Sequence, residues 1–184
     1  MRVIAGSARS LLLKTPEGLG TRPTTDRIKE TLFNMLMPYI PGAVFVDLFS
    51  GSGGIGIEAL SRGADKAYFV ENAKIALECI EDNVKHCHFE NEAVILKQDV
   101  FSALRGSINE EVDVIFMDPP YDQSYEKRAL EILKDEKYVT EDTLIVIEAS
   151  LETDFNYVEA LGYEIIKDKR YKTNKHLFVK RKAK

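Results

Sequence analysis

A glycine-rich turn between an apolar run and a helical pattern constrains the fold of this chain most strongly. Val44-Phe45-Val46-Asp47-Leu48-Phe49 has the apolar character of a strand buried within a parallel sheet. It leads into Gly51-Ser52-Gly53-Gly54-Ile55-Gly56, which matches G-x-G-x-x-G, and then into the helix-forming residues 57–63. Glycines there permit a tight turn and a close approach of the backbone to a ligand. The segment predicts a strand–turn–helix unit with a ligand site at the turn.

A second constraint is Asp118-Pro119-Pro120-Tyr121, which follows the apolar run of residues 112–117. Proline has no N–H to give to a sheet, so the pair must end the strand and turn the chain. A carboxylate, unpaired carbonyls and an aromatic ring are then left at a strand's carboxyl end, where open α/β sheets bind ligands. This arrangement suits a site that holds a planar base and accepts hydrogen bonds from its exocyclic amino group.

Acidic residues end two further expected strands. Glu71 closes residues 66–71, and a carboxylate there can accept both hydroxyls of a ribose. Asp99 follows residues 94–98, where it could accept from an adenine amino group. A nicotinamide cofactor is the most common ligand of G-x-G-x-x-G, but Asp47 would repel its pyrophosphate, and such an enzyme has no need of the Asp118 motif.

Strand and helix patterns alternate from Val44 onward, which predicts a mostly parallel, doubly wound α/β sheet. An extended hairpin is expected over residues 1–14, and a helix should begin near Thr24, Thr25 or Asp26 and end at Pro38. Further elements are expected at residues 72–86 and 125–133 (helices), 144–147 (a strand), and 163–166 with 176–179 (a closing antiparallel pair). We expect one domain over residues 1–184, with an N-terminal extension (1–23) and a core (24–184).

Charge is distributed unevenly, although the net charge is −5. Residues 1–30 carry six Lys/Arg against three Asp/Glu, and residues 167–184 carry nine against one. Residues 31–166 carry ten against 26. Basic ends on an acidic body predict a localised patch for phosphates, although solvated basic tails would give the same count. No apolar run approaches the roughly 20 residues of a membrane helix, and two cysteines indicate no disulfide framework, so a cytoplasmic location is expected.

The ordered set of Asp47 to Gly56, Glu71, Asp99 and Asp118 to Tyr121 resembles the Rossmann-like, S-adenosylmethionine-dependent methyltransferases. The segment 21–34, with its Arg-Pro-Thr-Thr-Asp-Arg, is similar to the RsmD type of bacterial 16S rRNA (guanine-N2)-methyltransferase, and the likeness covers nearly the whole chain. The resemblance implies a seven-stranded sheet with helices on both faces. It also implies methyl transfer from S-adenosylmethionine to the N2 amino group of a guanine in 16S rRNA, guanine 966 in the usual bacterial numbering.

The resemblance also implies roles for individual residues. The expected catalytic residues are Asp118, Pro119 and Tyr121. The expected cofactor-binding residues are Asp47, Gly51, Ser52, Gly53, Gly56, Glu71, Asp99 and Val100. Candidate RNA contacts are Arg2, Arg9, Arg22, Thr24, Arg27, Arg170 and Lys172. No metal is expected. The implied substrate is 16S rRNA in the small ribosomal subunit or a late assembly intermediate, with ribosomal proteins as further contacts for a monomeric enzyme.

Other functions remain open at this stage. The nearest alternative is adenine-N6 methylation of DNA or RNA, because the Asp118 motif serves both reactions. A nicotinamide-dependent oxidoreductase and a non-catalytic RNA-binding module are the others. Two segments depart from the family pattern: residues 7–12 lack the usual Gly-Arg pair, and Tyr171-Lys172 replaces a common Tyr-Gly step. Both departures concern RNA docking rather than cofactor use.

Overall fold

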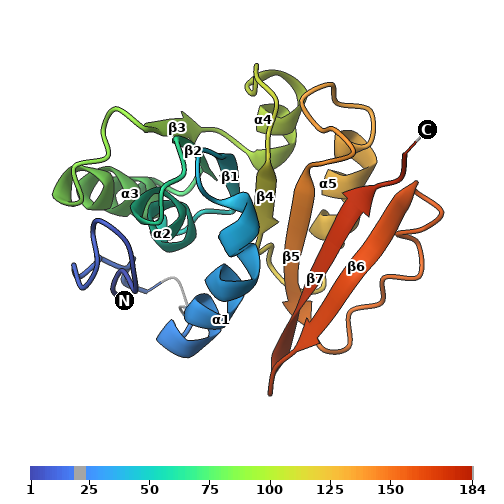
Figure 1. The fold of residues 1–184 in the computed structure, drawn as a ribbon, viewed down its shortest axis with the longest axis horizontal. Coiled ribbons are helices and arrows are strands. Elements are labelled where there is room, and N and C mark those ends of the chain that lie inside the picture. The colour runs from blue at the N-terminus through green and yellow to red at the C-terminus, as the bar shows by residue number, and fades with distance from the viewer. Residues whose placement is uncertain (19–23, 184) are drawn as a thin grey trace.

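The computed structural model describes residues 1–18 and 24–183, which form a seven-stranded mixed sheet with helices on both faces (Figure 1). The strands are β1 (Val44–Leu48), β2 (Lys66–Glu71), β3 (Ala93–Lys97), β4 (Val114–Met117), β5 (Leu144–Ser150), β6 (Tyr163–Arg170) and β7 (Asn174–Arg181). The helices are α1 (Asp26–Leu36), the 3₁₀ turn η1 (Met37–Tyr39), α2 (Gly54–Ser61), α3 (Lys74–His86), α4 (Val100–Gly106) and α5 (Tyr125–Leu133).

The strand order is β3-β2-β1-β4-β5-β7-β6. Strands β1 to β5 run parallel, whereas β7 is antiparallel to both β5 and β6. Strand β1 pairs with both β2 and β4, so the strand order reverses there. Ligands bind outside the carboxyl ends of the strands at such a reversal point. The doubly wound sheet and its closing antiparallel pair confirm the expectation from the sequence.

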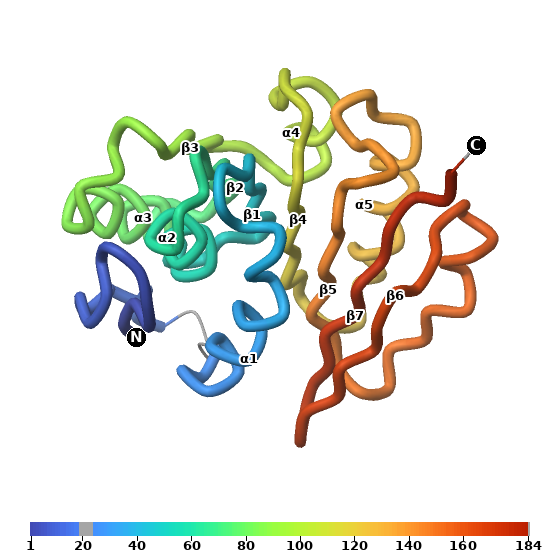
Figure 2. Tube along the Cα trace, viewed as in Figure 1, coloured from blue at the N-terminus to red at the C-terminus, as the bar shows by residue number. Residues whose placement is uncertain are grey.

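Helices cover the two faces of the sheet in separate groups (Figure 2). Alternate residues of β1 face opposite ways, because side chains alternate along a strand. Val46 and Leu48 pack with α4 and α5, whereas Phe45 packs with α1, α2 and α3. Both layers consist mainly of buried apolar side chains, and their packing positions the strand ends that form the site.

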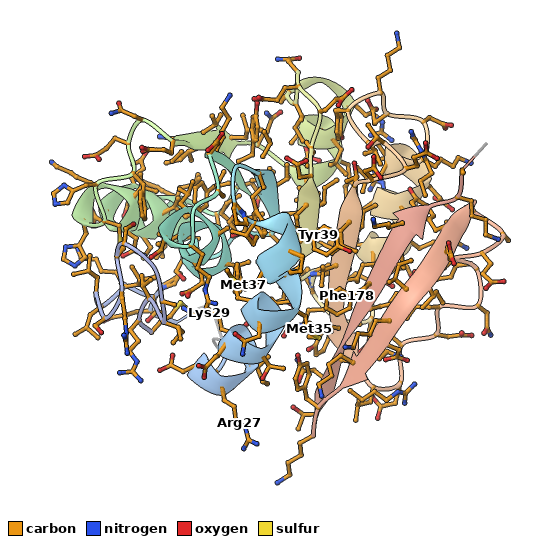
Figure 3. The ribbon with its side chains drawn as sticks, viewed as in Figure 1. Arg27, Lys29, Met35, Met37, Tyr39 and Phe178 are labelled. Atoms are coloured by element: carbon orange, nitrogen blue, oxygen red, sulfur yellow. The ribbon has the colours of Figure 1, made fainter. Side chains whose placement is uncertain are left out.

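Helix α1 begins where the sequence predicts. The Thr25 hydroxyl accepts a hydrogen bond from the Ile28 N–H and caps the helix. Pro38 lies in η1, so the helix ends as a 3₁₀ turn. Figure 3 shows α1 crossing the sheet, with Met35 and Tyr39 toward the side of Phe178. The Lys180 ammonium lies 5.3 Å from the centre of the Tyr39 ring, which links η1 to β7.

The N-terminal extension is looser than the expected hairpin. A single antiparallel bridge joins Arg2 to Leu12, and no regular strand forms among residues 1–18. Hydrogen bonds across it, including the Val3 N–H to the Leu11 carbonyl at 3.0 Å, still give the segment hairpin-like geometry. Helix α4 was not expected from the sequence, because its seven residues are too few for a clear periodic signal.

Candidate active site

One cavity of about 920 Å³ lies at the carboxyl ends of β1, β2, β4 and β5. Three of its walls come from the segments that the sequence singles out: the glycine turn, the Glu71 and Asp99 strand ends, and the Asp118 motif. The fourth comes from the N-terminal region, including Met1, Thr24 and Lys29. The volume suits a nucleoside-sized ligand together with a second planar group. The topology therefore brings the predicted motifs into one site.

The glycine turn is organised around the buried Asp47 carboxylate. Its Oδ2 accepts a hydrogen bond from the Gly56 N–H at 3.0 Å, which ties the end of β1 to the start of α2. Burial raises the pKa of Asp47 well above its ordinary range, and the nearby Asp118 and Glu71 carboxylates add to this rise. Asp47 thus fixes the glycine turn through its hydrogen bond to Gly56, and it also lines the cavity.

The glycines of this turn have different roles. Gly51 and Ser52 line the cavity, as expected, but Gly53 and Gly56 do not. Gly53 has φ +81°, a conformation that favours glycine, and it precedes α2 as its N-cap. A Cβ on Gly56 would lie 2.4 Å from the Phe69 ring, so this glycine permits α2 to pack on β2. Gly53 and Gly56 thus shape the turn and the helix packing here, and their expected contact with a cofactor stays a prediction.

Glu71 is held by backbone N–H groups. Its Oε2 accepts from Gly51 at 3.0 Å, and its Oε1 accepts from Asn72 and Ala73, both at 2.9 Å. The carboxylate therefore links the glycine turn to the end of β2 at the edge of the cavity. Oε1 thus accepts two hydrogen bonds and Oε2 accepts one, which leaves acceptor capacity on Oε2 for a further donor such as a hydroxyl.

Asp99 has a structural role that its sequence position did not reveal. Its Oδ1 accepts from the Ser102 N–H at 3.1 Å, which makes it the N-cap of α4. Hydrogen bonds from the Ser102 side chain and from its N–H lower the pKa of the Asp99 carboxyl. The side chain is exposed and lines the cavity beside Val100, also as expected. Capping leaves acceptor capacity on the carboxylate, so both roles are compatible.

The Asp118 motif leaves β4 at the centre of the cavity. Asp118, Pro119 and Tyr121 all line it. Burial, and then the negative charge of Glu148, raise the pKa of Asp118 well above its ordinary range. Tyr121 is 46% exposed, so part of this large aromatic residue at the cavity faces solvent. A carboxylate and a free aromatic face thus lie on one short turn.

Several lining residues were missed in the sequence. Phe49 stacks on Tyr125, with ring centres 6.1 Å apart, and Phe101 meets Tyr125 edge to face at 5.3 Å. All three rings line the cavity, as does Glu148 of β5. Phe101 directly follows the predicted residues Asp99 and Val100. The three aromatic residues, however, come from separate segments of the chain. Only the tertiary structure brings them together.

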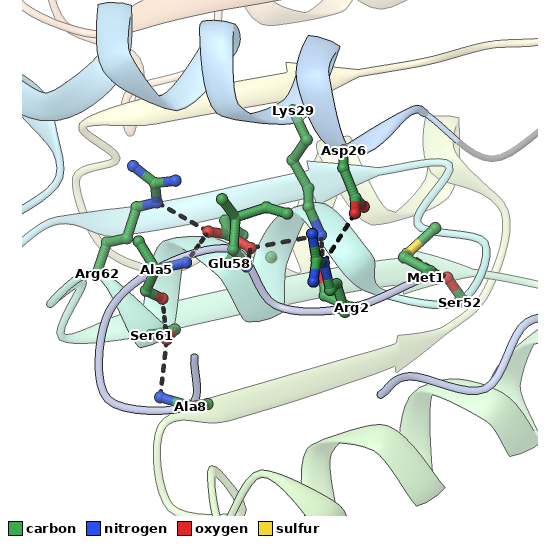
Figure 4. Close-up of polar contacts among 12 residues, drawn as sticks. Met1, Arg2, Ala5, Ala8, Asp26, Lys29, Ser52, Glu58, Ser61 and Arg62 are labelled. Carbon is green, nitrogen blue, oxygen red and sulfur yellow. Dashed lines mark hydrogen bonds and ion pairs between the residues drawn. The ribbon is translucent and has the colours of Figure 1, made fainter. Parts of the chain in front are cut away.

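A buried ionic cluster fixes the N-terminal wall (Figure 4). The Glu58 carboxylate of α2 accepts from the Ile4 and Ala5 N–H groups at 2.9 and 3.1 Å. It also pairs with Lys29 of α1 at 3.4 Å and with Arg62 at 2.9 Å. Burial lowers the pKa of Lys29 against the opposing effect of Glu58. The cluster holds the extension and α1 against α2, next to the glycine turn.

Most of the candidate RNA contacts that the structure describes are not part of the cavity lining. Of the seven, Thr24 lines the cavity, and Arg22 lies outside the described residues. Arg2 pairs with Asp26 at 2.9 Å. The other four are exposed and are not part of the lining: Arg9, Arg27, Arg170 and Lys172. Figure 3 shows Arg27 pointing outward from α1.

The β6–β7 turn lies at the same edge of the sheet as the cavity. Ser150, at the carboxyl end of β5, pairs with Asn174 at the start of β7. Arg170 and Lys172 therefore stand at the edge on which Asp118 lies. Within residues 1–18 and 24–183, no three His, Cys, Asp or Glu side chains gather as they would around a metal ion. No helix in those ranges is long and apolar enough to span a bilayer.

This sheet order, with a glycine turn after β1 and acids at successive strand ends, defines the Rossmann-like methyltransferase class. Two solved structures support this assignment over essentially the whole chain. The "Putative methyltransferase yhhF" of Escherichia coli has a TM-score of 0.85 at 29% identity, covering 100% of this chain and 99% of its own. A "putative methylase" of Haemophilus influenzae has a TM-score of 0.81 at 30% identity, with the same coverage.

The chain belongs to the family described as "Conserved hypothetical protein 95", whose model matches residues 1–180. A relative named "Putative rRNA methyltransferase YlbH" from Bacillus subtilis is 40% identical over 84% of this chain and 85% of its own length. The "Ribosomal RNA small subunit methyltransferase D" of Haemophilus influenzae is 35% identical over 92% and 88%. The family resemblance and the fold expected from the sequence are thereby confirmed.

Proposed function

We propose that this protein, acting as one domain over residues 1–184, transfers a methyl group from S-adenosylmethionine to the N2 amino group of a guanine in 16S rRNA. Guanine 966 of the usual bacterial numbering is the proposed target. The observation that carries the proposal is the convergence of the Asp118 motif and the glycine turn on one cavity. The relatives named for small-subunit rRNA methylation supply the substrate class.

The cavity walls fit S-adenosylmethionine. Glu71 offers Oε2 of a fixed carboxylate to the ribose, and Gly51 and Ser52 offer a close backbone approach for the amino-acid part. Asp99 and the Val100 N–H are the acceptor and donor proposed for the adenine, beside the Phe101 ring. When bound, the cofactor would supply an electrophilic methyl group on a positively charged sulfur. Loss of that methyl group leaves the cofactor as a neutral thioether.

The protein's own contribution to the chemistry is to position the nucleophile and to accept its proton. The guanine N2 lone pair is delocalised into the ring, so the amino group is a poor nucleophile. Hydrogen bonds from N2 to the Asp118 carboxylate and to the Pro119 carbonyl would fix its position and return electron density to nitrogen. Asp118 can then accept the proton that N2 loses, and its raised pKa suits that role.

Tyr121 is proposed to stack on the target base after the base leaves its helix. Its exposed ring at the cavity mouth is placed for such a contact. Stacking on an aromatic side chain contributes about 1–3 kcal/mol per base, which helps to offset the cost of unstacking. We further propose a monomer acting in the cytoplasm, where ribosomes assemble, on the small subunit or a late precursor, with ribosomal proteins contributing contacts.

The direct test is transfer of labelled methyl from S-adenosylmethionine to small subunits from a strain that lacks this gene, followed by nucleoside analysis. N2-methylguanosine at a single 16S position is the expected product. Label in N6-methyladenosine would show that the target base is adenine, while the proposed cofactor would stand. Absence of label in RNA, with cofactor binding intact, would overturn the proposed function. Naked 16S rRNA assayed in parallel tests whether the assembled particle is required.

A further inference from the structure

Glu148 is a second carboxylate in the cavity, next to Asp118. In the parallel ladder of β4 and β5, Met117 pairs with Ile147, so the next residues, Asp118 and Glu148, are neighbours at the same strand edge. Both line the cavity, and Glu148 is only 7% exposed. The negative charge of Glu148 also contributes to the raised pKa of Asp118. The proposed transfer step uses Asp118 but gives this buried acid no role.

The Glu148 side chain is fixed from behind by β7. Asn174 donates from Nδ2 to Oε1 at 3.0 Å, and Nε2 of the fully buried His176 lies 2.9 Å from Oε2. Because a carboxylate only accepts, His176 donates through Nε2, and its Nδ1 lies 3.1 Å from the Tyr171 hydroxyl. One donor on each oxygen leaves further lone pairs for a ligand. Glu148 is therefore a braced acceptor beside Asp118.

Two neighbouring acceptors match one purine edge better than the other. Guanine presents N1–H directly beside its N2 amino group, so two donors lie side by side. Adenine presents an acceptor, N1, beside its N6 amino group. A base extruded into an enzyme pocket is read by hydrogen bonds to this edge. A buried acceptor that faces the adenine N1 would remain unpaired, and such mismatches discriminate strongly between substrates.

We propose that Glu148 accepts the N1–H of the target guanine while Asp118 and Pro119 hold its N2 amino group. Glu148 is then the residue that selects guanine over adenine at a motif compatible with both. Asn174 and His176 are positioning residues, because they act through Glu148. This inference rests on the proposed guanine-N2 activity.

The test compares two bases at the methylated position of 16S rRNA in reconstituted small subunits. One is guanine, and the other is 2,6-diaminopurine, which keeps the 2-amino group but has an acceptor at N1. Wild-type protein should prefer guanine in kcat/KM by on the order of 100-fold or more. Glu148→Gln, whose amide can donate to N1, should reduce that ratio at least tenfold. Glu152→Gln, an exposed acid just beyond β5, is the matched control and should leave the ratio unchanged.

The outcomes separate the two proposals. If wild-type protein does not methylate the guanine substrate, the proposed function itself fails. If it does, and Glu148→Gln lowers both rates equally with folding and cofactor binding intact, Glu148 has only a structural role and the inference is overturned. Should Glu148→Gln not fold, equal wild-type rates on guanine and 2,6-diaminopurine would overturn the inference without any variant.

Discussion

At the scale of single residues, Asp118 combines burial with a need for negative charge. Its raised folded-state pKa means that the folded protein binds this proton more tightly than the unfolded chain does. The associated stability is full below the unfolded pKa of about 3.9 and is lost as pH rises through the folded pKa. At neutral pH the native carboxylate therefore destabilises the fold. An ionised Asp118 is nevertheless what the proposed transfer reaction requires.

Asp118→Asn should therefore separate stability from activity. We expect methyl transfer to fall by about 100-fold or more, because the amide cannot accept the N2 proton. The melting temperature at pH 7 should rise by roughly 2–4 °C for each kcal/mol recovered from the burial of this charge and from its repulsion by Glu148, and the gain should disappear in acid. Calorimetry across pH and a methyl-transfer assay measure both effects. Asp122→Asn, an exposed neighbour, should change neither; a destabilised Asp118→Asn would contradict this account.

Gly56 tests whether a motif glycine serves packing or the ligand. A methyl group there would meet the Phe69 ring at 2.4 Å. We expect Gly56→Ala to cost about 1–3 kcal/mol in the free energy of unfolding, as overpacked core positions do. Gly56→Ala should cost less when introduced into the Phe69→Leu variant than into the wild-type protein, as denaturant titration would show. The same cost in both backgrounds would exclude the ring as the cause.

Residues at strand ends were predictable, because an acid after an apolar run marks the carboxyl edge of a parallel sheet. Glu148 was not, since it lies inside the run that forms β5 and its partners are 26 and 28 residues away. The same limit hid the contact between Phe49 and Tyr125. Local patterns give the direction of a chain at one strand end, but they do not show which distant side chains share a cavity.

At the scale of elements, α2 holds the N-terminal wall through one carboxylate. Glu58→Ala would leave Lys29 and Arg62 without their acid and free the Ile4 and Ala5 N–H groups. We expect a loss of about 3–5 kcal/mol in the free energy of unfolding, as for other broken buried ion pairs. Hydrogen exchange should speed up first in residues 1–14, and cofactor affinity should fall because Met1 and Thr24 line the cavity.

The control for this cluster is Glu78→Ala, an exposed acid on α3. Its effect should stay within about 0.5 kcal/mol, and exchange in residues 1–14 should be unchanged. Equal protection of the extension in the Glu58 and Glu78 variants would show that apolar contacts such as Val3 hold it instead.

Helices and strands with long periodic patterns were placed well from the sequence, and α5 has the expected bounds of 125–133. The extension was harder to assign. Its hairpin-like loop is held by Glu58 and Ser61 of α2 rather than by a strand ladder of its own. An element whose partners lie more than 50 residues away has no local signature. Helix α4 begins at the cap formed by Asp99. From the sequence, the position of Asp99 after an apolar run predicts a ligand contact but not this cap.

At the scale of the molecule, the strand order brings the basic N-terminal segment and the basic β6–β7 turn to one edge of the sheet. The extension and α1 border the cavity on one side, and the β6–β7 turn lies at the same edge. Local patterns predict alternating strands and helices, but they do not give the order β3-β2-β1-β4-β5-β7-β6, which depends on packing between distant segments. The sequence alone shows that the charges are distributed unevenly, but only the strand order shows where the basic residues lie on the molecule.

The last prediction concerns this edge. Arg170→Ala/Lys172→Ala should weaken binding of small-subunit rRNA and lower the slope of log affinity against log salt by about two, roughly one for each phosphate that is no longer neutralised. Cofactor affinity should not change, because neither side chain lines the cavity. Lys134→Ala/Lys137→Ala is the matched control, since these residues precede β5 at the opposite edge of the sheet. RNA titrations at several salt concentrations would measure the slope for each double variant. Equal slopes for the two double variants would place the RNA elsewhere. A reduced slope for Arg170→Ala/Lys172→Ala alone would place the RNA backbone along the β6–β7 turn, at the sheet edge that carries Asp118.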